Sequence, residues 1–252
     1  METVSSSLLS LHPNIAACFT TRHGGVSKVP YTTANLAFHV GDDPRDVLDN
    51  HVLLAKQIGY DPQKLIHMRQ IHSDRIIIAD DSFDFNHPPE CDALITNLPD
   101  IPLMVMSADC TPILLYDPVQ RVIGVVHAGR AGALNAILPK TIERMAQTYG
   151  SRIGDVHVSM GPSIHGCCYE VNPQITAEVE AKGYPKALRK NGGKLFLDVN
   201  TVLLQQLESM QIRQAHIEVI DECTACHCDT YFSYRADHQH TGRIAGIIVL
   251  RP

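Results

Sequence analysis

Short apolar runs fill the middle of the chain, and they constrain the fold more than any other feature of the sequence. They are rich in β-branched residues and are separated by turn-forming residues, which is typical of strands. Strands are predicted over residues 15–22, 76–78, 103–106, 113–116, 122–126, 157–160 and 244–250. Helices are predicted over residues 44–58, 133–149, 173–182 and 199–210. Because helices and strands do not alternate regularly, we expect an α+β fold, with residues 1–252 as a single domain of mixed β-sheets and flanking helices.

Composition narrows the class of protein. The 252 residues are 44% hydrophobic and 19% charged, as is ordinary for a globular chain. The net charge is −6 and no Lys/Arg cluster stands out, which disfavours a nucleic acid or a membrane surface as a partner. The first residues lack the basic start of a signal peptide and no apolar run could span a bilayer, so a cytoplasmic location with reduced thiols is expected. The unusual counts are 14 His and 8 Cys, which suggest a metal.

Residues 107–127 are predicted to form a β-hairpin whose turn is residues 117–120. A turn centred between Pro118 and Val119 places Cys110 directly opposite His127. Opposed Cβ atoms lie about 4.5–5.5 Å apart, which lets a sulfur and an imidazole nitrogen share a metal. His72 precedes the strand at 76–78 and is a candidate third ligand. One Cys and two His suit zinc and leave a fourth position for a water molecule, which the metal would activate as a nucleophile.

A rival closed zinc site is Cys223-x-x-Cys226-His227-Cys228, since C-x-x-C is a common ligand spacing. It lacks a second C-x-x-C, and the adjacent Cys167 and Cys168 would be an awkward ligand pair. Further candidate ligands are His67, His165, His238 and His240. The alternative for Cys110 is a buried apolar thiol, and for His127 a polar side chain satisfied by hydrogen bonds. Local sequence does not separate the two sites.

Glycines and arginines suggest where an anion could bind. Residues 127–132 (HAGRAG) are predicted to join a strand to a helix, and their backbone amides could hold phosphate. A tight connection that needs small residues is the simpler interpretation. Arg22, Arg235 and Arg243 lie near glycines or aromatic residues and are candidate anion ligands, with surface solvation as the alternative. Residues 185–193 are expected to form a mobile surface loop.

Several motifs together resemble those of one family. They are residues 20–27 (TTRHGGVS), 30–44, 69–72 (RQIH), 92–96 (DALIT), 108–112 (ADCTP), 127–129 (HAG), 161–171 (GPSIHGCCYEV) and 232–243. From about residue 15 to the end, and in this order, they are similar to the YfiH or laccase-domain family. That family is also described as multicopper polyphenol oxidase-like and as purine nucleoside enzymes.

The resemblance implies a single α+β domain, a zinc ion on His72, Cys110 and His127 with copper as the alternative metal, and a substrate-binding role for Arg22. It implies an enzyme that acts on small-molecule purine nucleosides and phosphate: phosphorolysis of adenosine, inosine and 5′-methylthioadenosine, and deamination of adenosine. Copper-dependent oxidation of phenols and cytoplasmic editing of peptidoglycan precursors are other described roles. The family usually has His-Ala-Gly-Trp-Arg-Gly where this chain has Arg130 and Ala131, which puts the carry-over of substrate in question.

Two further hypotheses use the same residues. Asp109, next to Cys110, is a candidate general acid or base, although neighbouring residues on a strand face opposite sides. A metal-free Cys–His hydrolase or deamidase would use Cys110 as nucleophile and His127 as base. The metal content of the purified protein distinguishes the zinc enzyme from the metal-free hydrolase or deamidase. If the protein binds metal but turns over no nucleoside, it is a binding module and not an enzyme. The oligomeric state does not follow from the sequence.

Overall fold

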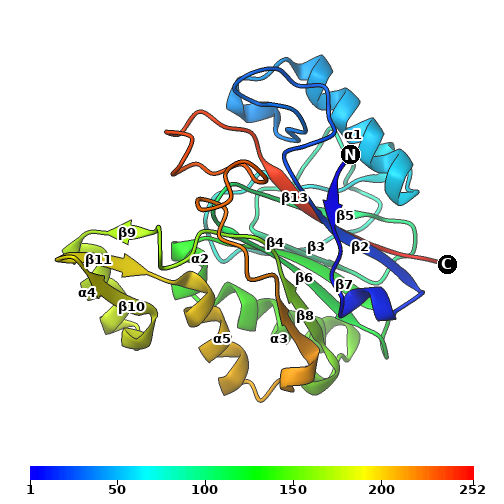
Figure 1. Cartoon of the computed structure of the whole chain (residues 1–252). Coiled ribbons are helices and arrows are strands. Elements are labelled where there is room, and N and C mark those ends of the chain that lie inside the picture. Colours follow the sequence, from blue (N-terminus) through cyan, green and yellow to red (C-terminus); the bar gives the residue numbers. More distant parts are fainter.

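The computed structural model describes residues 1–252, and its main elements stack as helix, sheet, sheet and helices (Figure 1). The four-stranded sheet has the order β1 (Thr3–Val4), β2 (Ile15–Thr20), β13 (Ile244–Leu250) and β5 (Leu103–Ser107). The six-stranded sheet has the order β12 (Ile217–Val219), β8 (His157–Met160), β6 (Thr111–Asp117), β7 (Val122–Ala128), β4 (Ala93–Thr96) and β3 (Ile76–Ile78). On the outer faces lie α1 (Pro44–Ile58) on the four-stranded sheet and α3 (Ile137–Tyr149) with α5 (Val199–Ser209) on the six-stranded one.

A small lobe extends from one side (Figure 1). It holds the three-stranded sheet β10 (Leu188–Asn191), β11 (Lys194–Leu197) and β9 (Glu170–Val171), together with α4 (Pro173–Ala181).

The core lies on both sides of the six-stranded sheet, so its central strands are buried on both faces. All seven residues of β6 and all seven of β7 are buried. In β7, Val125 packs between the two large sheets, while the next residue, Val126, packs toward α3 and α5. Strands buried on both faces read as continuous apolar runs in the sequence, which is why the pattern identified them.

The predicted fold class is confirmed. The two large sheets and their flanking helices form an α+β structure. The six-stranded sheet is mixed, because β12–β8 and β3–β4 are parallel while its other pairs are antiparallel. The helix at 44–58 begins as predicted: the Asp43 carboxylate accepts a hydrogen bond from the backbone N–H of Arg45 at 2.9 Å. It ends at Gly59, whose φ is 81°.

Two local predictions were wrong. The helix expected at 133–149 is two helices, α2 (Arg130–Leu134) and α3, because Ala136 adopts a left-handed conformation with φ of 59°. Residues 185–193 are not a loop: a 3-10 turn at Pro185–Ala187 leads into β10, which pairs with β11 around Gly192 and Gly193. Leu188 pairs with the buried Leu197, while the lysines and arginine that suggested a loop remain on the outside.

None of the helices combines the length and the apolar character that crossing a membrane requires.

Candidate metal centre and its cavity

β6 and β7 form the predicted hairpin, but the predicted register was wrong by two residues. Pro112, not Cys110, pairs with His127, and the last pair before the turn is Asp117 with Val122. The Asp117 carboxylate accepts hydrogen bonds from the backbone N–H groups of Val119 and Gln120 at 2.8 and 3.1 Å, so residues 118–121 make the turn. A shift of two residues leaves side chains on their predicted faces, since the strand period is two. Cys110 and His127 therefore still meet, diagonally.

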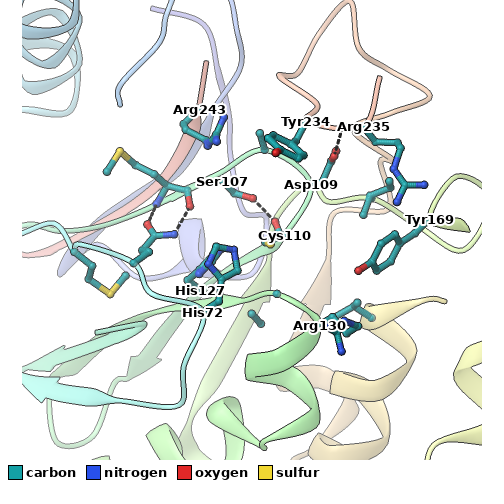
Figure 2. A pocket seen from close by; sticks show the side chains of 18 of the residues that line it. His72, Ser107, Asp109, Cys110, His127, Arg130, Tyr169, Tyr234, Arg235 and Arg243 are labelled. Carbon is teal, nitrogen blue, oxygen red and sulfur yellow. Dashed lines mark hydrogen bonds between the residues drawn. The ribbon is translucent and has the colours of Figure 1, made fainter. Parts of the chain in front are cut away.

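His72, Cys110 and His127 come together at the end of this hairpin (Figure 2). Their candidate ligand atoms, one sulfur and two imidazole nitrogens, all lie within 4.8 Å of one another. The two imidazole rings are 4.8 Å apart between centroids and nearly perpendicular, at 80°. The three side chains, called the metal trio below, form a donor set that could hold a metal ion.

Asp92 orients both histidines of the metal trio. Its fully buried carboxylate accepts hydrogen bonds from His127 Nδ1 at 2.9 Å and from the backbone N–H groups of His72 at 3.0 Å and Ser73 at 2.6 Å. Burial opposes its ionisation, but the hydrogen bonds from His127 and Ser73 outweigh burial and lower the pKa of Asp92. Because Nδ1 of His127 is engaged, Nε2 is the nitrogen left for a ligand.

The charge state of the metal trio follows from its packing. Burial opposes ionisation of Cys110, but the charge of His127 and hydrogen bonds from His127 and His72 outweigh it and lower the thiol pKa to about 6. Burial likewise opposes protonation of His127, but Cys110 and Asp92 raise its pKa to about 9. The site therefore provides a thiolate at neutral pH, the form that binds metals and attacks electrophiles.

The metal trio opens into a cavity of about 710 Å³, which is within the size range of small-molecule sites. Its other walls include Tyr169 and Tyr234, which offer aromatic faces, and the cations Arg130, Arg235 and Arg243 (Figure 2). The cavity is thus suited to a ligand that combines a flat ring with an anionic group.

Two of these arginines lack a carboxylate partner. The Arg243 guanidinium donates to the carbonyl oxygens of Thr241 and Gly242 at 3.1 and 3.0 Å, and no Asp or Glu oxygen lies within 4 Å of it. Burial lowers the pKa of Arg243, although a guanidinium remains charged. Arg235 similarly donates to backbone carbonyls and lies over the Tyr169 ring at 5.3 Å. Arg130 differs, since it pairs with Glu178.

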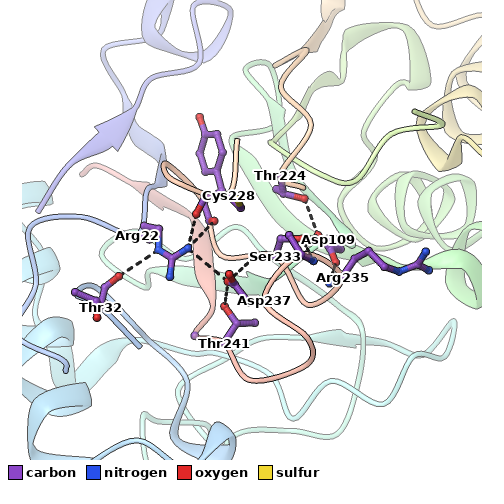
Figure 3. A network of polar contacts seen from close by, with 12 residues as sticks. Arg22, Thr32, Asp109, Thr224, Cys228, Ser233, Arg235, Asp237 and Thr241 are labelled. Atoms are coloured by element: carbon purple, nitrogen blue, oxygen red, sulfur yellow. Dashed lines mark hydrogen bonds and ion pairs between the residues drawn. The ribbon is translucent and has the colours of Figure 1, made fainter. Parts of the chain in front are cut away.

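Arg22 lies outside the cavity, in a polar network that reaches the cavity wall through Asp237, Ser233 and Asp109 (Figure 3). Its Nε donates to the Thr32 carbonyl at 3.2 Å, and its Nη1 contacts the Cys228 carbonyl and lies 3.4 Å from the Asp237 carboxylate. It is not among the residues that line the cavity. The structure therefore does not bring Arg22 together with the metal trio, and its role in substrate binding stays a prediction.

Asp109 holds the wall of the cavity. Its carboxylate accepts hydrogen bonds, each of 2.7 Å, from the hydroxyls of Thr224 and Ser233 and from the backbone N–H of Arg235 (Figure 3). These donors come from one long segment, residues 224–235, which they fasten to the end of β5. The carboxylate is thus already engaged by three donors, and the structure gives it a positioning role beside the predicted role in proton transfer.

Sequence reasoning missed several of these residues. Asp92 lies in the family motif at 92–96 and was given no role, although an acid immediately before a buried apolar strand could have pointed to a buried hydrogen-bond acceptor. Tyr169 and Tyr234 lie in the motifs at 161–171 and 232–243, but the sequence did not show that they line one cavity, because they come from distant segments. Conversely, His67, His165, His238 and His240 belong to neither of the two groups of candidate ligands in the structure.

Comparison with known proteins agrees with the motifs. Residues 16–251 match the sequence profile of a family described as multi-copper polyphenol oxidoreductase laccase. The chain belongs to this family. It is similar to a protein named purine nucleoside phosphorylase from Corynebacterium glutamicum, with 40% identity over 92% of this chain and 93% of that protein. A second protein named purine nucleoside phosphorylase, from Streptomyces coelicolor, is 38% identical to this chain, and the alignment covers 92% of this chain and 94% of that protein.

Solved structures show the same fold. The crystal structure of YlmD from Geobacillus stearothermophilus matches with a TM-score of 0.91 and 28% identity, covering 98% of this chain and 94% of that one. The crystal structure of Bacillus licheniformis YfiH matches with a TM-score of 0.89 and 30% identity, covering 94% and 93%. The family resemblance and the YfiH-like fold are therefore confirmed.

Proposed function

We propose that the protein is a purine nucleoside phosphorylase that binds zinc through His72, Cys110 and His127. The observation that carries the proposal is a single cavity that joins the metal trio to two arginines without carboxylate partners. Relatives that share most of their length with this chain are named for this activity. Adenosine, inosine and 5′-methylthioadenosine are the proposed substrates.

The proposed roles follow from charge and position. Arg243 and Arg235 bind phosphate, because a guanidinium with no carboxylate beside it can give its paired N–H donors to an anion. Tyr169 and Tyr234 hold the purine between aromatic faces. A phosphate oxygen then forms a bond to C1′ of the ribose, the C1′–N9 bond breaks and its electron pair goes to the departing purine, which takes up the proton that phosphate loses. The products are the free base and ribose 1-phosphate, or 5-methylthioribose 1-phosphate when the substrate is 5′-methylthioadenosine.

Zinc fits the donor set of the metal trio. A thiolate and two imidazoles are borderline-soft ligands, and the Asp92–His127 hydrogen bond is the usual support for a zinc-bound histidine. When bound, zinc would supply a Lewis acid at the floor of the cavity. Copper also accepts one Cys and two His, but coupled multicopper oxidation needs several copper ions and the metal trio provides one centre.

Deamination of adenosine is the second candidate activity. It is favoured by the number of ligands, since three protein ligands leave one coordination position for water. In this reaction the water oxygen bonds to C6 of adenine and ammonia leaves.

One assay separates these activities. Protein of known metal content is incubated with adenosine, with and without phosphate, and the products are separated by chromatography. Adenine and ribose 1-phosphate formed only with phosphate support phosphorolysis, whereas inosine shows deamination. Active metal-free protein that loses activity on alkylation of Cys110 would instead identify a Cys–His hydrolase and contradict the zinc proposal.

The arginine assignment has its own test. Arg243→Met is expected to raise the KM for phosphate at least about tenfold, because one charge-assisted contact is worth about 1.5–3 kcal/mol. Arg152→Met, on the exposed surface, is the matched control and should leave the KM unchanged. If Arg22→Met raises this KM at unchanged thermal stability while Arg243→Met does not, phosphate binding belongs to Arg22.

A further inference from the structure

Four cysteine side chains meet at a second place, away from the metal trio. The sulfur atoms of Cys167, Cys168, Cys223 and Cys226 all lie within 4.8 Å of one another. Sγ of Cys226 is 3.6 Å from that of Cys167 and 3.4 Å from that of Cys168. A tetrahedral zinc ion with Zn–S bonds of about 2.3 Å holds its sulfur atoms about 3.8 Å apart. A disulfide would need about 2.05 Å, so these sulfur atoms are too far apart for a disulfide and lie near the spacing that one zinc ion would impose.

The backbone brings the two pairs of cysteines together. β8 and β12 are parallel neighbours, with Met160 opposite Val219, and the pairing resumes beyond them as a bridge between Ser163 and Cys223. The N–H of Thr224 donates to the Ser163 carbonyl at 3.0 Å. The two segments therefore leave the sheet side by side and in the same direction, and each carries its cysteines within the next few residues.

The local structure of each segment suits ligation. Residues 165–169 form a turn in which the N–H groups of Cys168 and Tyr169 both donate to the His165 carbonyl at 3.0 Å. On the other segment, the N–H of His227 donates to the Cys223 carbonyl at 2.9 Å and closes a turn around the C-x-x-C spacing. The N–H of His165 also points at Sγ of Cys223, at 3.4 Å, as a donor to a thiolate would.

The sequence offered no second C-x-x-C to complete this site, and the adjacent Cys167 and Cys168 looked like an awkward ligand pair. In the structure these two cysteines supply the other half of the group, since Sγ of Cys226 lies within 3.6 Å of both sulfurs. His227 and Cys228, which the rival site had included, are not part of the group.

We propose that Cys167, Cys168, Cys223 and Cys226 bind a structural zinc ion. All four tetrahedral positions would be filled by the protein, so the site is closed and does not take part in the proposed reaction. The ion would fasten residues 161–169 to residues 223–228. Tyr169 follows Cys168 directly, and Arg235 donates to the Cys168 carbonyl at 3.4 Å, so the ion would also stabilise one wall of the cavity.

Metal analysis of single variants tests this proposal. Purified full-length protein is expected to hold about two zinc ions per chain, one in each site. Cys226→Ser and Cys110→Ser should each hold about one, whereas the matched control Cys228→Ser should hold about two. If Cys226→Ser does not fold, Cys168→Ser replaces it.

Cobalt gives a readout that identifies the ligands. Cys110→Ser protein reconstituted with Co²⁺ should show the intense visible absorption and sulfur-to-cobalt charge-transfer bands of a tetrahedral tetrathiolate complex. Adding Cys226→Ser should remove these bands. The proposal is overturned if wild-type protein holds one zinc ion that Cys110→Ser abolishes. It is also overturned if the intact mass of the unreduced polypeptide is about 2 Da below that of the reduced chain, because a disulfide then links two of the four cysteines. Neither outcome depends on nucleoside turnover.

Discussion

Asp92 is the residue on which the geometry of the metal trio depends most. Its carboxylate holds the His127 ring through Nδ1 and the backbone of His72 through the N–H group. His72 has a left-handed φ of 57°, which is uncommon for a non-glycine residue, and the hydrogen bond from its N–H group to Asp92 stabilises this conformation. One buried carboxylate thus controls two of the three proposed ligands.

Asp92→Asn should therefore weaken metal binding. The amide nitrogen cannot accept a hydrogen bond, so at least one of the donors from His127, His72 and Ser73 loses its partner. Changes in such supporting hydrogen bonds typically reduce metal affinity 10–100-fold, and we expect a loss of about that size in competition with a chelator. Asp80→Asn, a carboxylate on the surface, is the control. Equal affinities of Asp92→Asn and wild type would show that Asp92 does not position the ligands.

At the level of elements, the β6–β7 hairpin explains why Gly129 follows the His127 strand. Continuing the observed register places Gly129 opposite Cys110. A Cβ atom at Gly129 would lie 2.9 Å from Sγ of Cys110 and 3.3 Å from Cδ2 of His72. Only glycine leaves room for the thiol to approach the imidazoles.

Gly129→Ala should displace Cys110 and impair the site. Because a misplacement of about 1 Å can cost about 100-fold in rate, we expect kcat for nucleoside cleavage to fall by about that factor, together with a lower zinc content. Gly154→Ala is a matched control, since a Cβ there meets no atom within 4 Å and the backbone φ is not positive. Unchanged kcat and zinc content in Gly129→Ala would contradict the close contact.

Elements marked by local signals were predictable from the sequence. The Asp43–Pro44 start and the Gly59 end of α1 are such signals, and the buried strands appeared as apolar runs. The break between α2 and α3 was not predictable, because an alanine in a left-handed conformation looks like any other alanine. The hairpin register depended on side-chain hydrogen bonds of Asp117 within the turn. The partners of Cys223 and Cys226 depended on the pairing of β8 with β12, which joins residues far apart in the chain.

At the level of the whole molecule, two buried histidines make the stability of the fold depend on pH. Burial lowers the pKa of His51 to about 4, even though its Nε2 contacts the Leu36 carbonyl at 2.9 Å, and the charge of His67 adds to the shift. Burial also lowers the pKa of His67, whose Nε2 contacts the Phe85 carbonyl at 3.0 Å. Both side chains are therefore neutral in the folded protein over a range where they are protonated in the unfolded chain.

The free energy of unfolding should consequently fall as the pH decreases from about 6.5 toward 4. The unfolded state binds more protons in this range, at a cost of up to about 1.4 kcal/mol per pH unit for each histidine. Above about pH 7.5, where histidine is neutral in both states, the two histidines contribute almost no slope. Urea unfolding at a series of pH values measures the effect, and His51→Gln should flatten the slope relative to wild type. Parallel pH dependences of the two proteins would exclude His51 as a source.

Two properties of the cavity depend on different groups of residues. The hydrogen bonds of Asp92 hold His127 and His72, whereas the positive charge of the cavity comes from Arg130, the first residue of α2, and from Arg235 and Arg243, which lie in loops. Substitutions of these arginines can change which ligands the cavity attracts while the hydrogen bonds beneath the metal trio stay intact. Arg130 and Ala131, which stand where the family resemblance leads us to expect Trp-Arg, are an example. A chain with this architecture can therefore diverge in substrate preference without rebuilding its reactive centre.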